Sequence, residues 1–169
     1  MTQQVLVIDT SVMCCLLGVP GKDTCGSAGD RWDTARARDA VAAATARGSI
    51  IVLPLATIIE TGNHIAQAPS RRFDLASELS RYILLAADGE TPWAAFTDQA
   101  DLWGRERLRE LAATWPGLAA ASTSLGDASI KDVAEYYAKG GVEVEILTGD
   151  KGLKAYQPAR PPMIPRRRN

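Results

Sequence analysis

Short apolar runs alternate with longer helical patterns along this chain. Residues 5–8 and 50–53 are wholly apolar, which is typical of central parallel strands buried on both faces of a sheet. Residues 142–147 instead alternate valine or isoleucine with acids, so we expect a strand there with one face in water, near the sheet edge. The pattern also allows a further short strand over residues 93–96.

Helical patterns fill the gaps between these strands. Apolar residues recur at helical spacing, and glycine or proline follows several of the stretches. We expect helices over residues 30–47, 57–67, 70–87, 97–115 and 128–139. Residues 17–29 contain four glycines and a proline, which predicts a loop or flexible lid after the first strand region.

Alternating strands and helices predict the α/β class, as a three-layer α/β/α sandwich with a central parallel sheet covered on both sides. The chain has 169 residues, of which 46% are hydrophobic and 23% charged, an ordinary globular composition. We find no internal repeat and no linker. We therefore expect one domain over residues 1–157, followed by a basic Pro/Arg-rich tail over residues 158–169.

The composition narrows the classes of protein that fit. No apolar stretch approaches the roughly 18–20 residues that cross a bilayer, and the N-terminus resembles a strand rather than a signal peptide, so we expect a cytoplasmic protein without membrane contact. Three cysteines, Cys14, Cys15 and Cys25, make neither a disulfide framework nor a four-ligand zinc site. Buried or loop thiols are the simpler interpretation.

Four acids stand where an apolar strand ends or a helix begins: Asp9, Glu60, Asp127 and Asp150. The carboxyl ends of parallel strands lie along one rim of a sheet, where ligands normally bind, so the four carboxylates are expected to share a cleft. Clustered like charges raise one another's pKa or destabilise the fold unless a cation neutralises them. Carboxylate and water ligands suit Mg²⁺ or Mn²⁺ best.

Each of these acids also has a structural interpretation. The Thr-x-x-Glu pattern ending at Glu60 is a capping box, and the Ser-x-x-Asp pattern ending at Asp127 fits a helix start. Asp150 lies in Thr-Gly-Asp-Lys-Gly, where a turn residue accepts backbone N–H bonds. Asp9 has the weakest structural explanation. The joint placement of the four acids favours function.

The order of these motifs resembles that of the PIN-domain nucleases. Asp-Thr-Ser at 9–11 follows a strand, Glu60 opens a helix, and Gly-Asp-Ala-Ser-Ile at 126–130 precedes Leu-Thr-Gly-Asp at 147–150. Within that superfamily the chain looks most like the ribonuclease toxins of bacterial toxin–antitoxin pairs. The match extends over residues 5–156.

The resemblance implies a PIN-like α/β/α fold, an acidic Mg²⁺ or Mn²⁺ site, and endonucleolytic cleavage of RNA. Carried over residue by residue, the catalytic and metal-site residues are Asp9, Glu60, Asp127 and Asp150. Thr10, Ser11 and Thr148 are supporting hydroxyls beside them. The chain is longer than the compact toxins, and this departure from the pattern means that the resemblance does not carry over an antitoxin. An antitoxin or other protein partner is one expectation among several.

Weaker signals point to substrate contacts, and the residues concerned are Asn63, His64, Lys131, Lys151, Arg166, Arg167 and Arg168. His64 lies one helical turn after Glu60, although a lone histidine on a helix is more often a surface residue. The lysines and the tail arginines suit phosphate, or are ordinary solvated charges in a chain of net charge −1. The four tryptophans suit base stacking, although helix packing explains Trp103 and Trp115 better.

Three functions remain open. The first is a metal-dependent endoribonuclease, the second a nuclease acting on DNA or flap structures, and the third a non-catalytic binding or regulatory module. Ser11 stands where a haloacid-type phosphatase has a second acid, and neither a P-loop nor a G-x-S-x-G elbow is present. We also expect a homodimer or a protein partner to use the apolar faces of the two middle helices.

Overall fold

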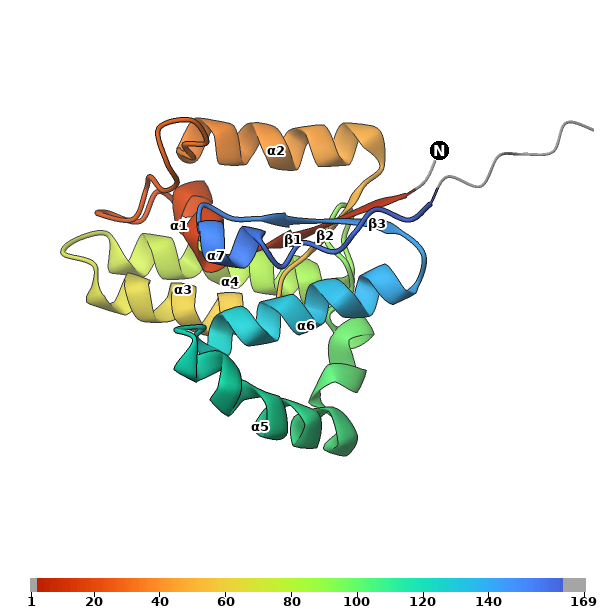
Figure 1. Ribbon diagram of the computed structural model, residues 1–169. Helices are drawn as coiled ribbons and strands as arrows, with labels where there is room; N and C mark the ends of the chain where they lie inside the picture. The colour runs from red at the N-terminus through yellow and green to blue at the C-terminus, as the bar shows by residue number, and fades with distance from the viewer. Residues whose placement is uncertain (1–2, 163–169) are drawn as a thin grey trace, which may run out of the picture.

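The computed structural model describes residues 3–162 and contains one parallel sheet of three strands (Figure 1). The strands are β1 (Gln4–Ile8), β2 (Ile50–Val52) and β3 (Glu143–Leu147), in the spatial order β2-β1-β3. Val7 is aligned with Val52 on one side and with Ile146 on the other. The protein is therefore of the mixed α/β class with a parallel sheet, as the alternating sequence pattern predicts.

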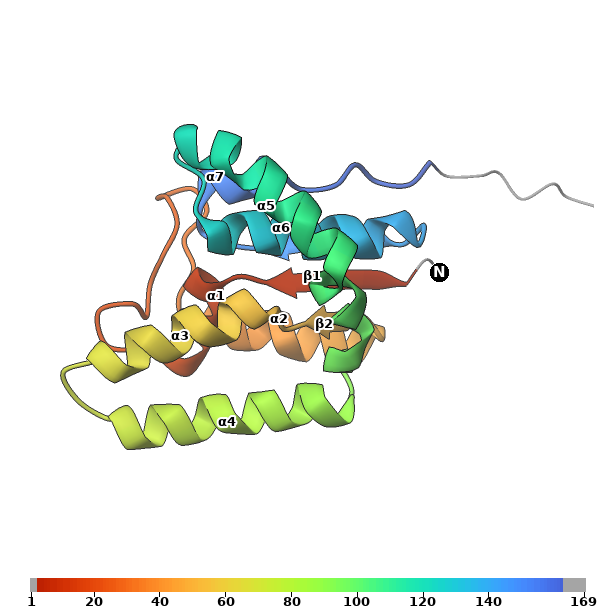
Figure 2. The same ribbon diagram turned by 90° about the horizontal axis from the view of Figure 1, so that it is seen from below.

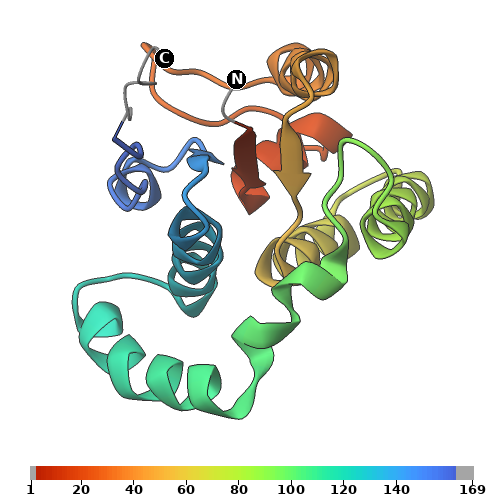
Figure 3. The ribbon, with the colours of Figure 1, turned by 90° about the vertical axis from the view of Figure 1, so that its right-hand side faces the viewer.

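Helices lie on both sides of this sheet (Figure 1). They are α1 (Thr10–Leu17), α2 (Thr34–Arg47), α3 (Leu55–Gln67), α4 (Arg72–Asp88), the 3₁₀ helix η1 (Phe96–Trp103), α5 (Arg105–Ala120), α6 (Leu125–Lys139) and α7 (Lys151–Lys154). In Figure 2, α3 and α4 lie toward the β2 side of the molecule and α5 and α6 toward the opposite side. Figure 3 shows α5 farthest from the sheet.

The central strand contributes to two hydrophobic clusters. Leu6 and Ile8 pack with side chains of α1, α2 and α4, whereas Val5 and Val7 pack with side chains of α6 and β3. Successive side chains of a strand point to opposite faces, so a wholly apolar run such as β1 buries both faces. This burial fixes the position of the strand end, where Asp9 follows.

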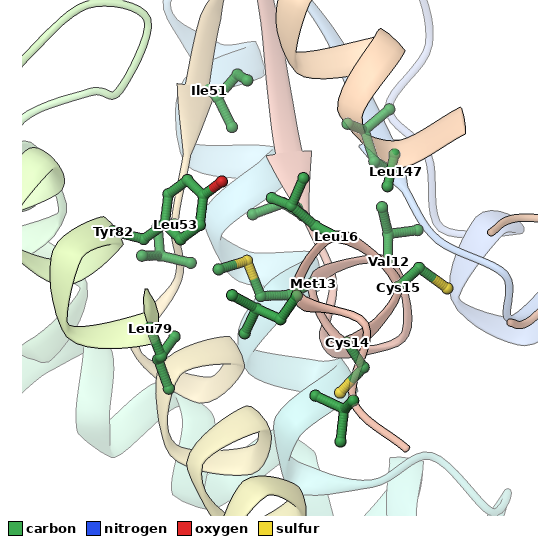
Figure 4. Close-up of a cluster of buried hydrophobic side chains, with 14 of the residues drawn as sticks. Val12, Met13, Cys14, Cys15, Leu16, Ile51, Leu53, Leu79, Tyr82 and Leu147 are labelled. Carbon is green, nitrogen blue, oxygen red and sulfur yellow. The ribbon is translucent and has the colours of Figure 1, made fainter. Parts of the chain in front are cut away.

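The sequence pattern gave no sign of α1. Seven of its eight residues are buried, and Figure 4 shows Val12, Met13 and Leu16 among side chains from the sheet and α4. A helix that is apolar on all sides lacks the amphipathic period by which a surface helix is detected. Gly18, with a φ of 67°, ends α1 in the left-handed conformation that glycine adopts without strain.

Several predicted boundaries are wrong. Helix α2 begins at Thr34 rather than residue 30, because Asp33 caps it by accepting a hydrogen bond from Arg36 N at 2.8 Å. The segment predicted as one helix over 97–115 is two helices with Gly104 between them, and α5 continues through Pro116 to Ala120. Residues with good helical spacing on both sides of Gly104 concealed the break.

Two predictions about strands also need correction. Strand β2 lies at the sheet edge rather than in its centre, since its one paired strand is β1. The strand allowed over residues 93–96 is reduced to an isolated bridge between Trp93 and Ile51, and Phe96 already belongs to η1. The backbone of Ile51 donates to Pro92 O at 2.7 Å and accepts from Ala94 N at 2.8 Å. This short segment covers the edge that a fourth strand would occupy.

Within residues 3–162, no helix combines the length and the apolar character that crossing a bilayer requires.

Helix α4 exposes Phe73 and Leu84, of which 82% and 63% of the surface is accessible. Eleven residues is close to three helical turns, so both lie on one face. Self-association through the middle helices stays a prediction, and sedimentation that finds only monomer at every concentration would contradict it.

Candidate functional site

The structure brings four acids from four separate segments to one cleft of about 370 Å³. Asp9 follows β1, Glu60 lies on α3, Asp127 in the first turn of α6, and Asp150 after β3. Together they are called the cleft acids below. The cleft lies outside the carboxyl ends of the strands, where α/β sheets bind ligands.

Asp9 is buried, with 4% of its surface accessible, and it is held by neutral donors. Its Oδ1 accepts Thr10 N at 2.6 Å, while its Oδ2 accepts Ser11 Oγ at 2.7 Å and Thr148 Oγ1 at 2.8 Å. Asp9 is also the N-cap of α1, where the helix dipole favours a negative charge. The carboxylate therefore joins the ends of β1 and β3 and is fixed in orientation.

Glu60 is held by Thr10, whose Oγ1 donates to Glu60 Oε2 at 2.9 Å. The capping-box interpretation of Glu60 is wrong, because α3 begins after Pro54 and Thr57 lies inside the helix. Thr57 is fully buried and donates to the carbonyl of Ile8 at 2.8 Å. Glu60 is thus not needed to cap its own helix.

Asp127 lies at a helix start, as its sequence pattern predicts. Ser124 caps α6 by accepting a hydrogen bond from Asp127 N at 3.0 Å. Burial raises the pKa of the Asp127 carboxyl, the charges of Asp9 and Asp150 raise it further, and hydrogen bonding to Ser124 opposes the change. A cation in the cleft would stabilise the charged carboxylate of Asp127 and so oppose this rise in pKa.

Asp150 has a structural task as well as a place in the cleft. Its Oδ1 accepts Gly152 N at 2.6 Å and Leu153 N at 3.0 Å, so it caps α7, as the turn interpretation predicts. Its own N–H donates to Thr148 Oγ1 at 2.9 Å. Because Thr148 also donates to Asp9, one hydroxyl connects two cleft acids.

The three predicted hydroxyls therefore all contact cleft acids or their backbone. Thr10 donates to Glu60, and Thr148 donates to Asp9. Ser11 donates to Asp9 and accepts Gly149 N at 3.0 Å, which joins α1 to the turn before Asp150. A hydroxyl that fixes the rotamer of a carboxylate preorganises a site.

The weaker substrate-binding candidates differ in whether they line the cleft. His64 is half-buried and lines the cleft, whereas Asn63 is exposed and does not. Lys131 does not line it either: its Nζ lies 3.6 Å from Glu135 Oε1 and 5.1 Å from the ring centre of Tyr156. Lys151 is exposed outside the cleft lining. The tail residues Arg166, Arg167 and Arg168 lie outside the described residues.

The tryptophans pack mainly as structural residues. Trp32 is buried with the guanidinium of Arg36 at 4.0 Å from its ring centre, and Trp93 is buried with its ring centre 5.0 Å from that of Tyr82. Trp103 and Trp115 are half-buried, as expected for helix packing. None of the four lines the acidic cleft.

One wall of the cleft comes from residues that the sequence pattern did not assign to the site. They are Cys14 on α1 and, in the glycine-rich loop that follows, Gly21, Lys22, Thr24 and Cys25. Helix α1 carries the chain away from the strand end, so the loop after it returns along the same rim. Lys22 brings a positive charge to an otherwise acidic lining. If α1 had been predicted, the position of the following loop beside this rim could have been inferred from the sequence.

The donor set fits a hard divalent cation held by few protein ligands. Among residues 3–162, no three His, Cys, Asp or Glu side chains are gathered tightly enough to form a ready-made ligand cluster. Mg²⁺, however, commonly uses one or two carboxylates and keeps several waters. Burial raises the pKa of Asp127 most and the charges of Asp9 and Asp150 add to this, so a cation in the cleft would stabilise the charged carboxylate.

Comparisons of the chain with protein-family models, with curated proteins and with solved structures found no match in any of the three.

Proposed function

We propose that this protein is a metal-dependent endoribonuclease, a phosphodiester hydrolase of the PIN-domain kind. One observation carries the proposal: four acids from distant segments line a single cleft at the carboxyl ends of parallel strands. Asp9 is buried, Glu60 and Asp127 are half-buried, and Asp150 is exposed. Carboxylates held by neutral hydrogen-bond donors are a poor binding surface for an anionic substrate on their own. The same carboxylates are a good binding surface for a cation, and the bound cation can in turn bind phosphate.

Asp9 and Asp127 would hold Mg²⁺ or Mn²⁺ directly, and Asp150 would complete the site directly or through one of the waters that the cation keeps. The bound cation supplies positive charge to an approaching phosphodiester and lowers the pKa of water. Glu60 accepts a hydrogen bond from Thr10 through Oε2, which leaves Oε1 to orient a water or accept its proton. Lys22 in the cleft wall binds phosphate oxygens.

The test is cleavage of matched single-stranded RNA, structured RNA and DNA by the purified protein with Mn²⁺, beside a chelator control. Asp127→Asn should reduce cleavage at least about 100-fold, since the variant removes a charge while keeping the shape of the side chain. Asp132→Asn is the matched control, because Asp132 is another half-buried acid of α6 that does not line the cleft.

Asp127 is a better test position than Asp9. Asp9→Asn removes an acceptor from Ser11 or Thr148 and weakens the cap of α1, so a loss of activity there mixes chemistry with folding. Equal cleavage by wild type and Asp127→Asn would overturn the proposal. Faster cleavage of the matched DNA would overturn its ribonuclease part and favour a DNA or flap nuclease. Silence on every substrate, with no Mn²⁺ binding, would favour a binding module.

A further inference from the structure

Two cysteine sulfurs lie next to each other at the wall of the acidic cleft. The thiol of Cys15, fully buried on α1, donates to Cys25 Sγ at a sulfur–sulfur distance of 3.6 Å. Cys25 is half-buried in the glycine-rich loop and lines the cleft. The neighbouring Cys14 is separate from this pair, since Figure 4 shows its sulfur on a different side of α1 from that of Cys15.

The backbone holds Cys25 in this position. Cys25 N donates to Trp32 O at 3.1 Å, and Trp32 N donates to Cys25 O at 2.8 Å. Gly149 makes room for the sulfur, because a Cβ at residue 149 would lie 2.6 Å from Cys25 Sγ. Gly149 stands between Thr148 and Asp150. The Cys25 thiol therefore lies between α1 and the turn that carries a cleft acid.

We propose that Cys15 and Cys25 are a redox modification site that forms a reversible disulfide on reaction with a hydroperoxide. The two sulfurs are already in contact and come from segments ten residues apart, one on a fixed helix and one on a loop. Formation of the bond needs only a short movement of the loop. The reaction does not depend on the proposed nuclease chemistry, because neither thiol holds a cleft acid.

The steps balance with hydrogen peroxide as the oxidant. The Cys25 thiolate attacks one peroxide oxygen; an S–O bond forms, the O–O bond breaks, and the leaving hydroxide takes a proton to become water. The Cys15 thiol then attacks the sulfenic sulfur; the S–S bond forms, the S–O bond breaks, and a second water leaves with the Cys15 proton. Two thiols and one peroxide become one disulfide and two waters.

The surroundings decide which cysteine meets the oxidant. Burial, followed by the hydrogen bond with Cys25, raises the pKa of Cys15 above its ordinary range, so Cys15 stays protonated at neutral pH. Cys25 is the more accessible of the two. The disulfide would fix the loop that carries Lys22 and Thr24 against α1, and with it one wall of the cleft.

The experiment treats the full chain with hydrogen peroxide and measures intact mass, free thiols and disulfide-linked peptides. We expect a loss of about 2 Da, one remaining thiol of the three, a linked peptide pair containing Cys15 and Cys25, and reversal by dithiothreitol. Cys14→Ser is the matched control and should still form the bridge. Cys25→Ser should not form it.

The alternative products are equally distinct. Retention of three free thiols, a gain of roughly 16 or 32 Da without a bridge, or a bridge that contains Cys14 would overturn the proposal. Trypsin tests the effect on the loop, because Lys22 is exposed. Cleavage after Lys22 should slow several-fold in the oxidised protein and recover on reduction, and equal rates in both forms would overturn the inference that the bridge fixes the loop.

Discussion

The cleft acids are held by hydroxyls and backbone N–H groups rather than by basic side chains. Asp9 accepts from Ser11 and Thr148, and Glu60 accepts from Thr10. Among residues 3–162, none of the four forms an ion pair. Neutral donors fix the position of a carboxylate and leave its charge uncompensated, which is the arrangement that a cation site requires.

A glycine next to Glu60 gives a residue-scale prediction. A Cβ on Gly126 would lie 2.0 Å from Glu60 Oε1, so Gly126→Ala must displace that carboxylate from the position in which Thr10 holds it. The obstructed atom ends a flexible side chain, so the fold should tolerate the change. We expect cleavage by the purified variant to fall at least about tenfold, since a displacement of about 1 Å costs that much or more at an active site.

Gly62→Ala is the control for this change. Gly62 lies on α3, the helix of Glu60, and a Cβ there meets nothing within 4 Å. The control should keep full activity and gain about 0.5–1 kcal/mol in the free energy of unfolding, because alanine favours a helix over glycine. Full activity in Gly126→Ala would show that Glu60 is not held in a functional position.

At the scale of elements, the sequence predicted the parts of the fold that carry a clear period. The amphipathic stretch of α4 and the apolar run of β1 were recognisable in this way, and α6 was recognised from Gly140 and Gly141 at its end. Helix α1 was not, because almost all of its residues are buried, and the edge position of β2 depends on where residues 92–94 pack. The burial of α1 and the edge position of β2 both depend on tertiary packing, which the local sequence pattern does not show.

The candidate site was predictable to a similar degree. Strand ends can be read from the sequence, so the cleft acids were found. Contacts between distant segments cannot be read from the sequence, which is why Lys22 was missed. For the same reason Lys131 was predicted to bind substrate, although it contacts Glu135 and Tyr156. The supporting role of Thr148 follows from β1–β3 pairing, which brings residue 148 beside Asp9.

The contact between Asp30, which directly follows the glycine-rich loop, and Lys154 of α7 gives an element-scale prediction on pH. Hydrogen bonds from Lys154 and Arg36 hold the pKa of Asp30 below its usual range. A depressed pKa in the folded state stabilises the protein above the unfolded pKa of about 3.9, and that stabilisation is lost as pH falls through the lower, folded value. Because the groups are partly exposed, it should be below about 1 kcal/mol.

Urea unfolding of wild type and Asp30→Asn at pH 7 and pH 3 measures this contribution. The wild type should be the more stable at pH 7, and the difference should narrow at pH 3, where the wild-type carboxyl begins to take up a proton. Asp39→Asn is a suitable control, since Asp39 is an exposed acid of α2 that forms no ion pair in the described part of the chain. A difference independent of pH would contradict the electrostatic account.

For the whole molecule, the arrangement of charge matters more than its sum. The chain has a formal net charge of −1, yet four acids from distant segments line one cleft at one end of the sheet. Folding brings these charges together, and the raised pKa of Asp127 reflects burial together with its two acidic neighbours. A cation that binds the folded cleft and not the unfolded chain must therefore stabilise the whole protein.

This linkage predicts that Mn²⁺ raises the midpoint of thermal unfolding. At a concentration ten times the dissociation constant, binding contributes about 1.4 kcal/mol, which corresponds to roughly 3–6 °C for a domain of this size. Differential scanning fluorimetry in chelator and in Mn²⁺, at equal ionic strength, measures the shift. Asp127→Asn should raise the midpoint in chelator, because it removes a half-buried charge beside two others, and should reduce the Mn²⁺ shift. Asp132→Asn should keep the full shift, and equal shifts in all three proteins would place the cation outside the cleft.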